Sequence, residues 1–319
     1  MVMNDPMPQV AARPQLRRWL RLLLALQLVG LVAAILLLHL RGMPAGAAIA
    51  WALGVWVLVL WLCAAGGFAI KALHGDWPAA TRGGPARALA TLLVESAWML
   101  RLFLVDMPWR PAPLRLDLGD QRPPVLLVHG FLCNGAVWCP LEDELRAAGL
   151  RFAAVSLQPS YRDFERQLAD LRSAVDWLRA RSGQSRVLLV GHSMGGLLVR
   201  AFAGRNPGLV AGAIMVAAPH HGTALGDLIH GIEGGPPSPR ARWLQDFNRR
   251  SDERLPLPAL NLWSGDDNIV VPAASSALRG VAERRTDGHG HMALIAAPEA
   301  RAGLSAAILE LLNRMEQAA

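Results

Sequence analysis

The sequence predicts an α/β protein: a mainly parallel sheet with helices on both faces, preceded by a transmembrane helical hairpin. Two observations support this prediction. After residue 108, short apolar runs such as 125–128 and 187–190 alternate with stretches of helical periodicity, which is typical of strands buried under helices on both faces. Before it, two apolar stretches at 22–38 and 45–70 come close to or exceed the roughly 20 residues that a membrane-spanning helix needs.

Residues 1–75 are interpreted as a membrane anchor with two transmembrane helices. The 319-residue chain is 53% hydrophobic, which is high for a soluble protein, and the two apolar stretches account for the excess. The connection HLRGMP at 39–44 contains a glycine and a proline and predicts a tight turn. A cleaved signal peptide is the alternative for the first stretch, because basic residues precede it. The second stretch follows at once, which favours the hairpin.

Residues 76–110 are interpreted as an amphipathic or interfacial linker. Within them, 89–109 is apolar but carries Glu95, Arg101 and Asp106. A third membrane span would bury these charges at a high energetic cost. A helix that lies on the membrane surface or packs on the following domain is therefore favoured. If this helix did cross the membrane, the orientation predicted below would reverse.

The distribution of basic residues orients the hairpin. Nine Lys/Arg stand against four Asp/Glu in residues 1–109, so five of the seven net positive charges lie there. By the positive-inside rule we expect a multi-pass protein of the inner (cytoplasmic) membrane whose following domain faces the cytoplasm. Membrane lipids with anionic headgroups suit this charge, whereas the second half has no basic stripe for nucleic acid. The basic residues that flank the spans are Arg13, Arg17, Arg18, Arg21, Lys71, Arg82 and Arg87.

Residues 111–319 are expected to form one α/β domain. Because open parallel sheets place their active sites at the carboxyl ends of strands, the residues that follow each strand are the candidates for chemistry. The expected strands are 125–128, 152–157, 187–190, 212–219 and 258–264, and the expected helices are 136–148, 162–182 and segments near 293–316.

Ser193 stands at the sharpest predicted turn of this domain. It follows the apolar run 187–190 and precedes a stretch with helical periodicity, so the chain must reverse direction within about two residues at the serine. Side chains two positions before and after a residue in such a strained turn would collide, and Gly191 and Gly195 remove that collision. The pattern predicts an exposed hydroxyl at a helix N-terminus, which is the geometry of a serine nucleophile.

An acid and a histidine follow Ser193 in the order that a catalytic triad of this kind requires. Asp267 in SGDDNIVVP is the preferred acid, with its neighbour Asp266 as the alternative. His291 in GHGHMAL is the preferred base, with His289 as the alternative. The imidazole would take the proton of the serine, and the carboxylate would orient the imidazole and stabilise its charged form.

Two backbone N–H groups are the candidates for an oxyanion hole. That of Met194 directly follows the serine, and that of Phe131 follows His129-Gly130, where the glycine permits a close approach of the loop. The remaining histidines are given structural roles: His192 faces away from the pocket and packs or bonds locally, His129 braces the oxyanion loop, and His220 and His221 shape a strand end. Because the domain is expected to face the reducing cytoplasm, we expect free thiols. The cysteines and histidines lack the spacing of a metal site, so we expect no metal.

The segments HGFLCNGAVW, GHSMGGLLVR, APHHGTALG, SGDDNIVVP and GHGHMAL together resemble the bacterial esterase/lipase branch of the α/β-hydrolase superfamily, over about residues 120–300. The resemblance implies hydrolysis of carboxylic esters through an acyl-enzyme, with no cofactor. It also implies a lid over the site, and here the corresponding insert, near 223–256, is short.

The sequence thus predicts a membrane-anchored serine hydrolase whose substrate is an acyl ester or another lipid-like molecule. Two alternatives stay open at this point. An acyltransferase or thioesterase would use the same triad, and a membrane scaffold would keep the fold without the chemistry. Neither the acyl chain length nor the oligomeric state follows from the sequence.

Overall fold

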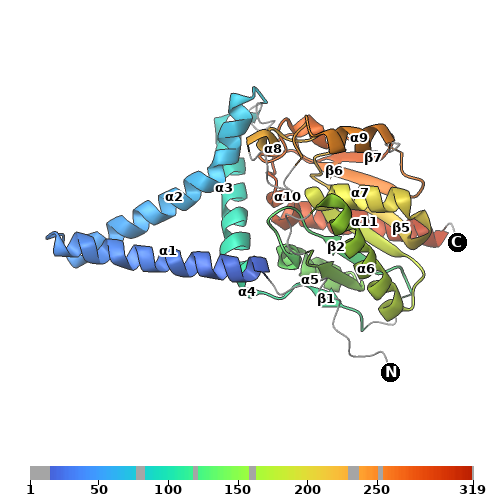
Figure 1. Ribbon diagram of the computed structural model, residues 1–319, viewed down its shortest axis with the longest axis horizontal. Coiled ribbons are helices and arrows are strands. Elements are labelled where there is room, and N and C mark those ends of the chain that lie inside the picture. Colours follow the sequence, from blue (N-terminus) through green and yellow to red (C-terminus); the bar gives the residue numbers. More distant parts are fainter. Residues whose placement is uncertain are drawn as a thin grey trace.

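A seven-stranded sheet forms the centre of the domain (Figure 1). The computed structural model describes residues 15–76, 83–117, 121–157, 163–228, 237–250 and 254–317. The strand order is β1-β3-β2-β4-β5-β6-β7, and every neighbouring pair is parallel except β1 with β3. The strands are β1 Leu114–Arg115, β2 Val125–Val128, β3 Phe152–Val155, β4 Val187–His192, β5 Val210–Val216, β6 Ala259–Trp263 and β7 Ala282–Arg285. The predicted α/β class with a mainly parallel sheet is confirmed.

Helices cover both faces of this sheet, as the continuous apolar strands predict. Within β2, Val125 and Leu127 contribute to one core cluster, whereas Leu126 and Val128 contribute to the other, because successive side chains of a strand point to opposite faces. The first face packs against η3 Gly135–Leu141, α5 Glu142–Ala147 and α11 Pro298–Gln317. The second packs against α6 Phe164–Ser182, α7 Met194–Arg205 and α9 Arg242–Arg250.

Three apolar helices precede the sheet domain. They are α1 Gln15–Leu40, α2 Ala45–Leu73 and α3 Pro85–Arg101, and α3 continues through the π-helical turn η2 Leu102–Asp106 into α4 Met107–Trp109. By length and composition, α1, α2 and the continuous segment Pro85–Trp109 are each able to cross a membrane. In Figure 1, α1 and α2 project away from the sheet domain as a hairpin, while α3 runs along the domain between the bases of the two helices.

The base of the hairpin is tied to the segment that leads into the sheet. Arg17 and Arg21 in the first turns of α1 donate to the backbone carbonyls of Arg110 and Pro108, the second at 2.8 Å. The Arg21 guanidinium also lies 4.7 Å from the centre of the Trp109 ring, which is cation–π distance. Leucine, valine and tryptophan side chains farther along the hairpin are exposed. The arginines thus hold one end of α1 while its apolar length stays uncovered by protein.

Several elements differ from the predicted ones. The segment expected as one helix at 136–148 is a 3-10 helix followed by the short α5, because Pro140 cannot donate a backbone hydrogen bond. The strand β7 was not predicted, since its residues AERR are all exposed and carry no apolar run. In the insert at 223–256 the structure contains α8 Ala224–Leu228 and α9. The part of the lid prediction at 229–236 and 251–253 lies outside the described residues.

Candidate active site

Ser193 occupies a strained turn between β4 and α7. Its backbone angles are φ 56° and ψ −127°, a conformation that side chains other than glycine rarely adopt. The turn is held by its own backbone, because Ser193 N–H donates to Val216 O of the neighbouring strand at 2.8 Å. Met194 is the first residue of α7, so its N–H is among those that lack a partner inside the helix.

The glycines around Ser193 are required by close backbone approaches. A Cβ atom on Gly191 would lie closer than 3.0 Å to the backbone of Gly195, and one on Gly195 would lie closer than 3.0 Å to Val128 O. A Cβ on Gly130 would lie 2.8 Å from the Cβ of Ser193. The turn and the loop after β2 therefore touch, which brings the segment of Phe131 next to the serine.

Asp267 and His291 meet in a buried hydrogen bond. Nδ1 of His291 lies 2.8 Å from Oδ2 of Asp267, and their side chains are 4% and 1% exposed. The other carboxylate oxygen, Oδ1, accepts from the N–H groups of Ile269 and Val270 at 2.8 Å each. Asp267 is therefore fixed by its own loop while it orients the imidazole.

The rivals of these two residues lie elsewhere. Asp266 is buried, but its Oδ2 accepts from Gly288 N–H at 2.6 Å, so it braces the loop before His291 without contacting the imidazole. His289 is half-buried. Within the described residues, His291 bonds to Asp267, Asn268 and His192, and no hydrogen bond joins it to the Ser193 hydroxyl. Such a contact is often long before a substrate is bound.

His192 lies against His291, although the sequence assigned it a local role away from the pocket. Its Nε2–H donates to the backbone carbonyl of His291 at 3.1 Å, and the two ring centres are 4.6 Å apart. Burial, and then the charge of His291, hold the pKa of His192 well below its usual range. His192 therefore stays neutral and connects the serine turn to the histidine loop.

The charge environment of His291 favours its protonated form. Burial by itself lowers its pKa, but the Asp267 charge and hydrogen bond, together with the Glu95 charge, raise the pKa above the usual value of 6.5. An imidazole that accepts a proton readily is the property that a general base needs.

The loop that carries Phe131 is braced by His129. The backbone N–H of Leu157 donates to Nε2 of His129 at 2.9 Å, so the remaining ring proton is on Nδ1, which donates to Gly130 O at 2.8 Å. Burial lowers the pKa of His129 to about 4. A neutral, doubly bonded imidazole thus fixes the residue before Phe131.

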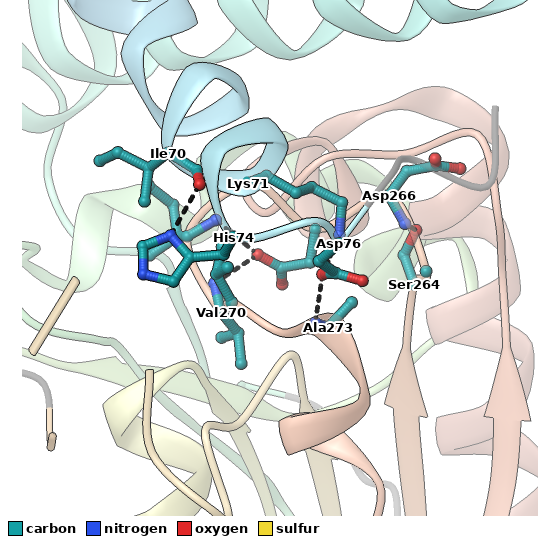
Figure 2. Close-up of polar contacts among 12 residues, drawn as sticks. Ile70, Lys71, His74, Asp76, Ser264, Asp266, Val270 and Ala273 are labelled. Carbon is teal, nitrogen blue, oxygen red and sulfur yellow. Dashed lines mark hydrogen bonds and ion pairs between the residues drawn. The ribbon is translucent and has the colours of Figure 1, made fainter. Parts of the chain in front are cut away.

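The loop that carries Asp267 is supported by two distant segments. Thr223 Oγ1 donates to Ile269 O and accepts from Val271 N–H at 3.1 Å. Beyond the end of α2, Asp76 accepts from Ala273 N–H at 2.7 Å and pairs with the buried Lys71 (Figure 2). The candidate active site is thereby joined to the apolar helices.

Asn268 and Glu95 were not singled out from the sequence as contributors to this site. Asn268 Oδ1 accepts from the backbone N–H of His291 at 3.0 Å, and Glu95 of α3 accepts from the two following N–H groups. Asn268 directly follows Asp267 in the sequence, and this position could have marked it as a contributor to the site. For Glu95, the only signal was a charge in an apolar segment, which we interpreted as evidence against membrane crossing.

Comparisons with known proteins identify the fold. Residues 123–256 match the family model of the alpha/beta hydrolase fold. The mature lipase BlEst2 of Bacillus licheniformis superposes with a TM-score of 0.52 at 18% identity, over 62% of this chain and 96% of the lipase. The chain therefore has the α/β-hydrolase fold.

Sequence relatives that share part of this chain include lipases and an epoxide hydrolase. A triacylglycerol lipase of Burkholderia plantarii is 29% identical over 40% of this chain and 38% of the lipase. Epoxide hydrolase 3 of Xenopus tropicalis is 33% identical over 44% of this chain and 40% of that enzyme. The chain thus matches well under half the length of these curated relatives. It resembles the esterase and lipase branch of the α/β-hydrolase superfamily, as its motifs predict.

The close packing around the Ser193 turn leads to a prediction about the stability of the fold. Replacing Gly195 with alanine should lower the free energy of unfolding by about 1–3 kcal/mol, because overpacking displaces backbone that has no room to move. The midpoint of thermal unfolding in detergent measures the change.

Gly204, nine residues farther along α7, supplies the matched control. A Cβ there would meet nothing closer than Leu255 at 3.8 Å, and alanine in a helix should raise stability by about 0.5–1 kcal/mol. Equal midpoints for Gly195→Ala and Gly204→Ala would contradict the packing argument.

Proposed function

We propose that this protein is a membrane-anchored serine hydrolase that cleaves carboxylic esters of lipid-like acyl chains. The observation that supports this most directly is the buried hydrogen bond between His291 and Asp267, in loops that lie beside the strained turn of Ser193. In this proposal Ser193 is the nucleophile, His291 the general base and Asp267 the triad acid. The N–H groups of Phe131 and Met194 form the oxyanion hole.

The first half of the reaction forms an acyl-enzyme. His291 takes the proton of the Ser193 hydroxyl as the oxygen attacks the ester carbonyl, and the new oxyanion accepts hydrogen bonds from the two backbone donors. The imidazolium, stabilised by Asp267, then gives its proton to the departing alkoxide. The alcohol leaves, and the acyl group stays on the serine.

The second half releases the acid. A water molecule gives a proton to His291 as it attacks the acyl carbonyl, and the proton returns to Ser193 when the carboxylic acid leaves. An alcohol or a thiol in place of this water would make the enzyme an acyltransferase. Competition of added alcohol with water for the acyl-enzyme separates these two activities.

The division of the chain supports a substrate that partitions into the bilayer. We assign 1–75 to a two-helix anchor, 76–110 to an interfacial linker and 111–319 to the catalytic domain, with a short lid-like insert near 223–256. The exposed apolar side chains of α1 and α2 would lie in lipid. An enzyme tethered in this way meets lipid-like esters by diffusion in two dimensions.

Fluorophosphonate labelling tests the nucleophile. The wild-type protein in membranes should be labelled and should hydrolyse p-nitrophenyl esters, whereas Ser193→Ala should lose the label and at least about a thousandfold in rate, because no other group can form the acyl-enzyme. A series of esters of increasing chain length then reports the acyl preference.

A folded wild-type protein that neither labels nor hydrolyses any ester of the series would contradict the proposal and favour a scaffold role. Ser185→Ala is the matched control, because Ser185 precedes β4 and lies outside the candidate site. It should label like the wild type.

A second prediction concerns the pH dependence of the reaction and the contribution of the Asp267 charge to it. The base must be neutral to accept the serine proton, so kcat/KM should fall on acidification, with a midpoint above 6.5 because the pKa of His291 is raised. Asp267→Asn removes a charge that raises this pKa, so the midpoint should move to lower pH, and the rate should fall by up to about ten-thousandfold.

Asp266→Asn is the control for this profile, since Asp266 bonds to Gly288 N–H and not to His291. It should keep the wild-type midpoint. If the pH midpoint of kcat/KM moved in Asp266→Asn and stayed unchanged in Asp267→Asn, Asp266 and not Asp267 would be the triad acid.

The basic ends of the hairpin support an orientation with the catalytic domain in the cytoplasm. Arg17, Arg21 and Lys71 lie at the ends of α1 and α2 that contact the domain, and the positive-inside rule puts such ends in the cytoplasm. A reporter fused after Ala319 should be active only if it is a cytoplasmic reporter, and one inserted at 39–44 only if it is periplasmic. Periplasmic activity after Ala319 would reverse the proposed topology.

A further inference from the structure

One face of α3 is fitted to the segment that carries His291. Thr91, Glu95 and Trp98 follow one another at the helical spacing of four and three residues. Thr91 Oγ1 donates to Gly288 O at 3.4 Å. Trp98 packs against a small cluster of alanines from α10 Ala293–Ala296 to the start of α11, which are Ala293, Ala297 and Ala300. Leu89 and Leu93 on another face of α3 are about half-exposed. α3 therefore presents its polar and aromatic positions to the active-site segment.

Glu95 is the central contact of this face. Its side chain is fully buried, and its two carboxylate oxygens accept from the backbone N–H of Met292 at 2.9 Å and of Ala293 at 2.8 Å. These two residues directly follow His291, whose own N–H donates to Asn268 at 3.0 Å. Three successive N–H groups at the histidine thus have fixed acceptors, two of them supplied by α3.

A buried carboxylate at this place has a cost that packing alone does not explain. Removing a charge from water is unfavourable unless hydrogen bonds replace its hydration, and an apolar side chain would fill the same space without that cost. The two N–H donors supply such bonds. On the other side, a Cβ on Gly290 would lie closer than 3.0 Å to the Glu95 carboxylate. The glycine before His291 in the GHGH motif thus admits the glutamate.

We propose that Glu95 is a positioning residue for His291, through which the docking of α3 on the catalytic domain sets the reactivity of the active site. The apolar helices would then serve as part of the active-site scaffold as well as a tether. This inference rests on the proposed hydrolase function. It adds a residue that touches neither the substrate nor the reacting atoms but holds the backbone of the base.

The groups that face His291 make the role of Glu95 measurable. Asp267 bonds to Nδ1, and the His192 ring lies 4.6 Å away and is held neutral by burial and by the His291 charge. The Glu95 charge acts in the same direction as that of Asp267 and raises the pKa of His291. Burial raises the pKa of Glu95 itself to about 7, against the two backbone hydrogen bonds that lower it. The Glu95 charge is therefore fully present only above that pH. A neutral replacement of Glu95 should therefore move the pH midpoint of the reaction, which a loss of fold stability alone would not do.

The test compares full-length wild type with Glu95→Gln in the same detergent. Glutamine keeps the size and one acceptor oxygen, but its amide group meets an N–H donor, so one of the two hydrogen bonds is lost. We expect kcat per fluorophosphonate-labelled enzyme to fall by about tenfold or more, as for the loss of a buried charged hydrogen bond. KM should change less, and the pH midpoint should move to lower pH.

Asp163→Asn is the matched control. Asp163 is also a carboxylate that accepts from two backbone N–H groups, those of Glu165 and Arg166 at the start of α6, but it does not contact the His291 segment. It should keep the wild-type kcat and midpoint. Gly290→Ala perturbs the Glu95 contact from the other side, and it should reproduce the fall in kcat, so it decides the matter if Glu95→Gln does not fold.

Unchanged kcat per labelled enzyme together with an unchanged midpoint would overturn the inference, even if less folded protein were recovered. A wild-type protein that does not label would instead overturn the proposed function, before any variant is compared. The two failures are therefore distinguishable.

Discussion

The buried hydrogen bond between His291 and Asp267 is the interaction on which the rest of the site depends. Its partners come from two irregular loops, which follow β6 and β7, and neither loop has a ladder or helix of its own to fix it. A charged or polar side chain that is less than 5% exposed costs stability unless hydrogen bonds replace its contacts with water. The surrounding contacts serve this need: Asp267 accepts from its own loop, and His291 is held by Asn268 and by Glu95.

The apolar helices take part in this support. Asp76, beyond the end of α2, accepts from Ala273 in the acid loop, and Glu95 of α3 accepts from the residues after His291. In Figure 1, α3 and the C-terminal end of α2 lie next to the domain, while the rest of the hairpin projects away from it. A segment whose composition suits a bilayer is thus also connected to the loops that hold the proposed base and acid.

Much of the fold could be predicted because local patterns decide it. Apolar runs with no polar interruption identify strands buried on both faces, and the two long apolar stretches identify the hairpin helices. The turn at Ser193 was predictable for the same reason. Gly191 and Gly195 avoid steric clashes that any side chain would make with backbone within a few residues of the serine and on the adjacent strand. β7 was missed because an exposed, charged edge strand has no apolar pattern, and its pairing with β6 is what forms it.

The sequence by itself determined the central alternation of strands and helices, the apolar hairpin and the strained position of Ser193, because these depend on neighbours close along the chain. Only the tertiary structure decided which of two adjacent aspartates bonds to which of two nearby histidines, and that Glu95 bonds to the segment after His291. The sequence shows which residue types follow each strand and therefore reach the same edge of the sheet. The direction of a side chain in an irregular loop depends on contacts from elements that lie 24 to 198 residues away, which no local pattern contains.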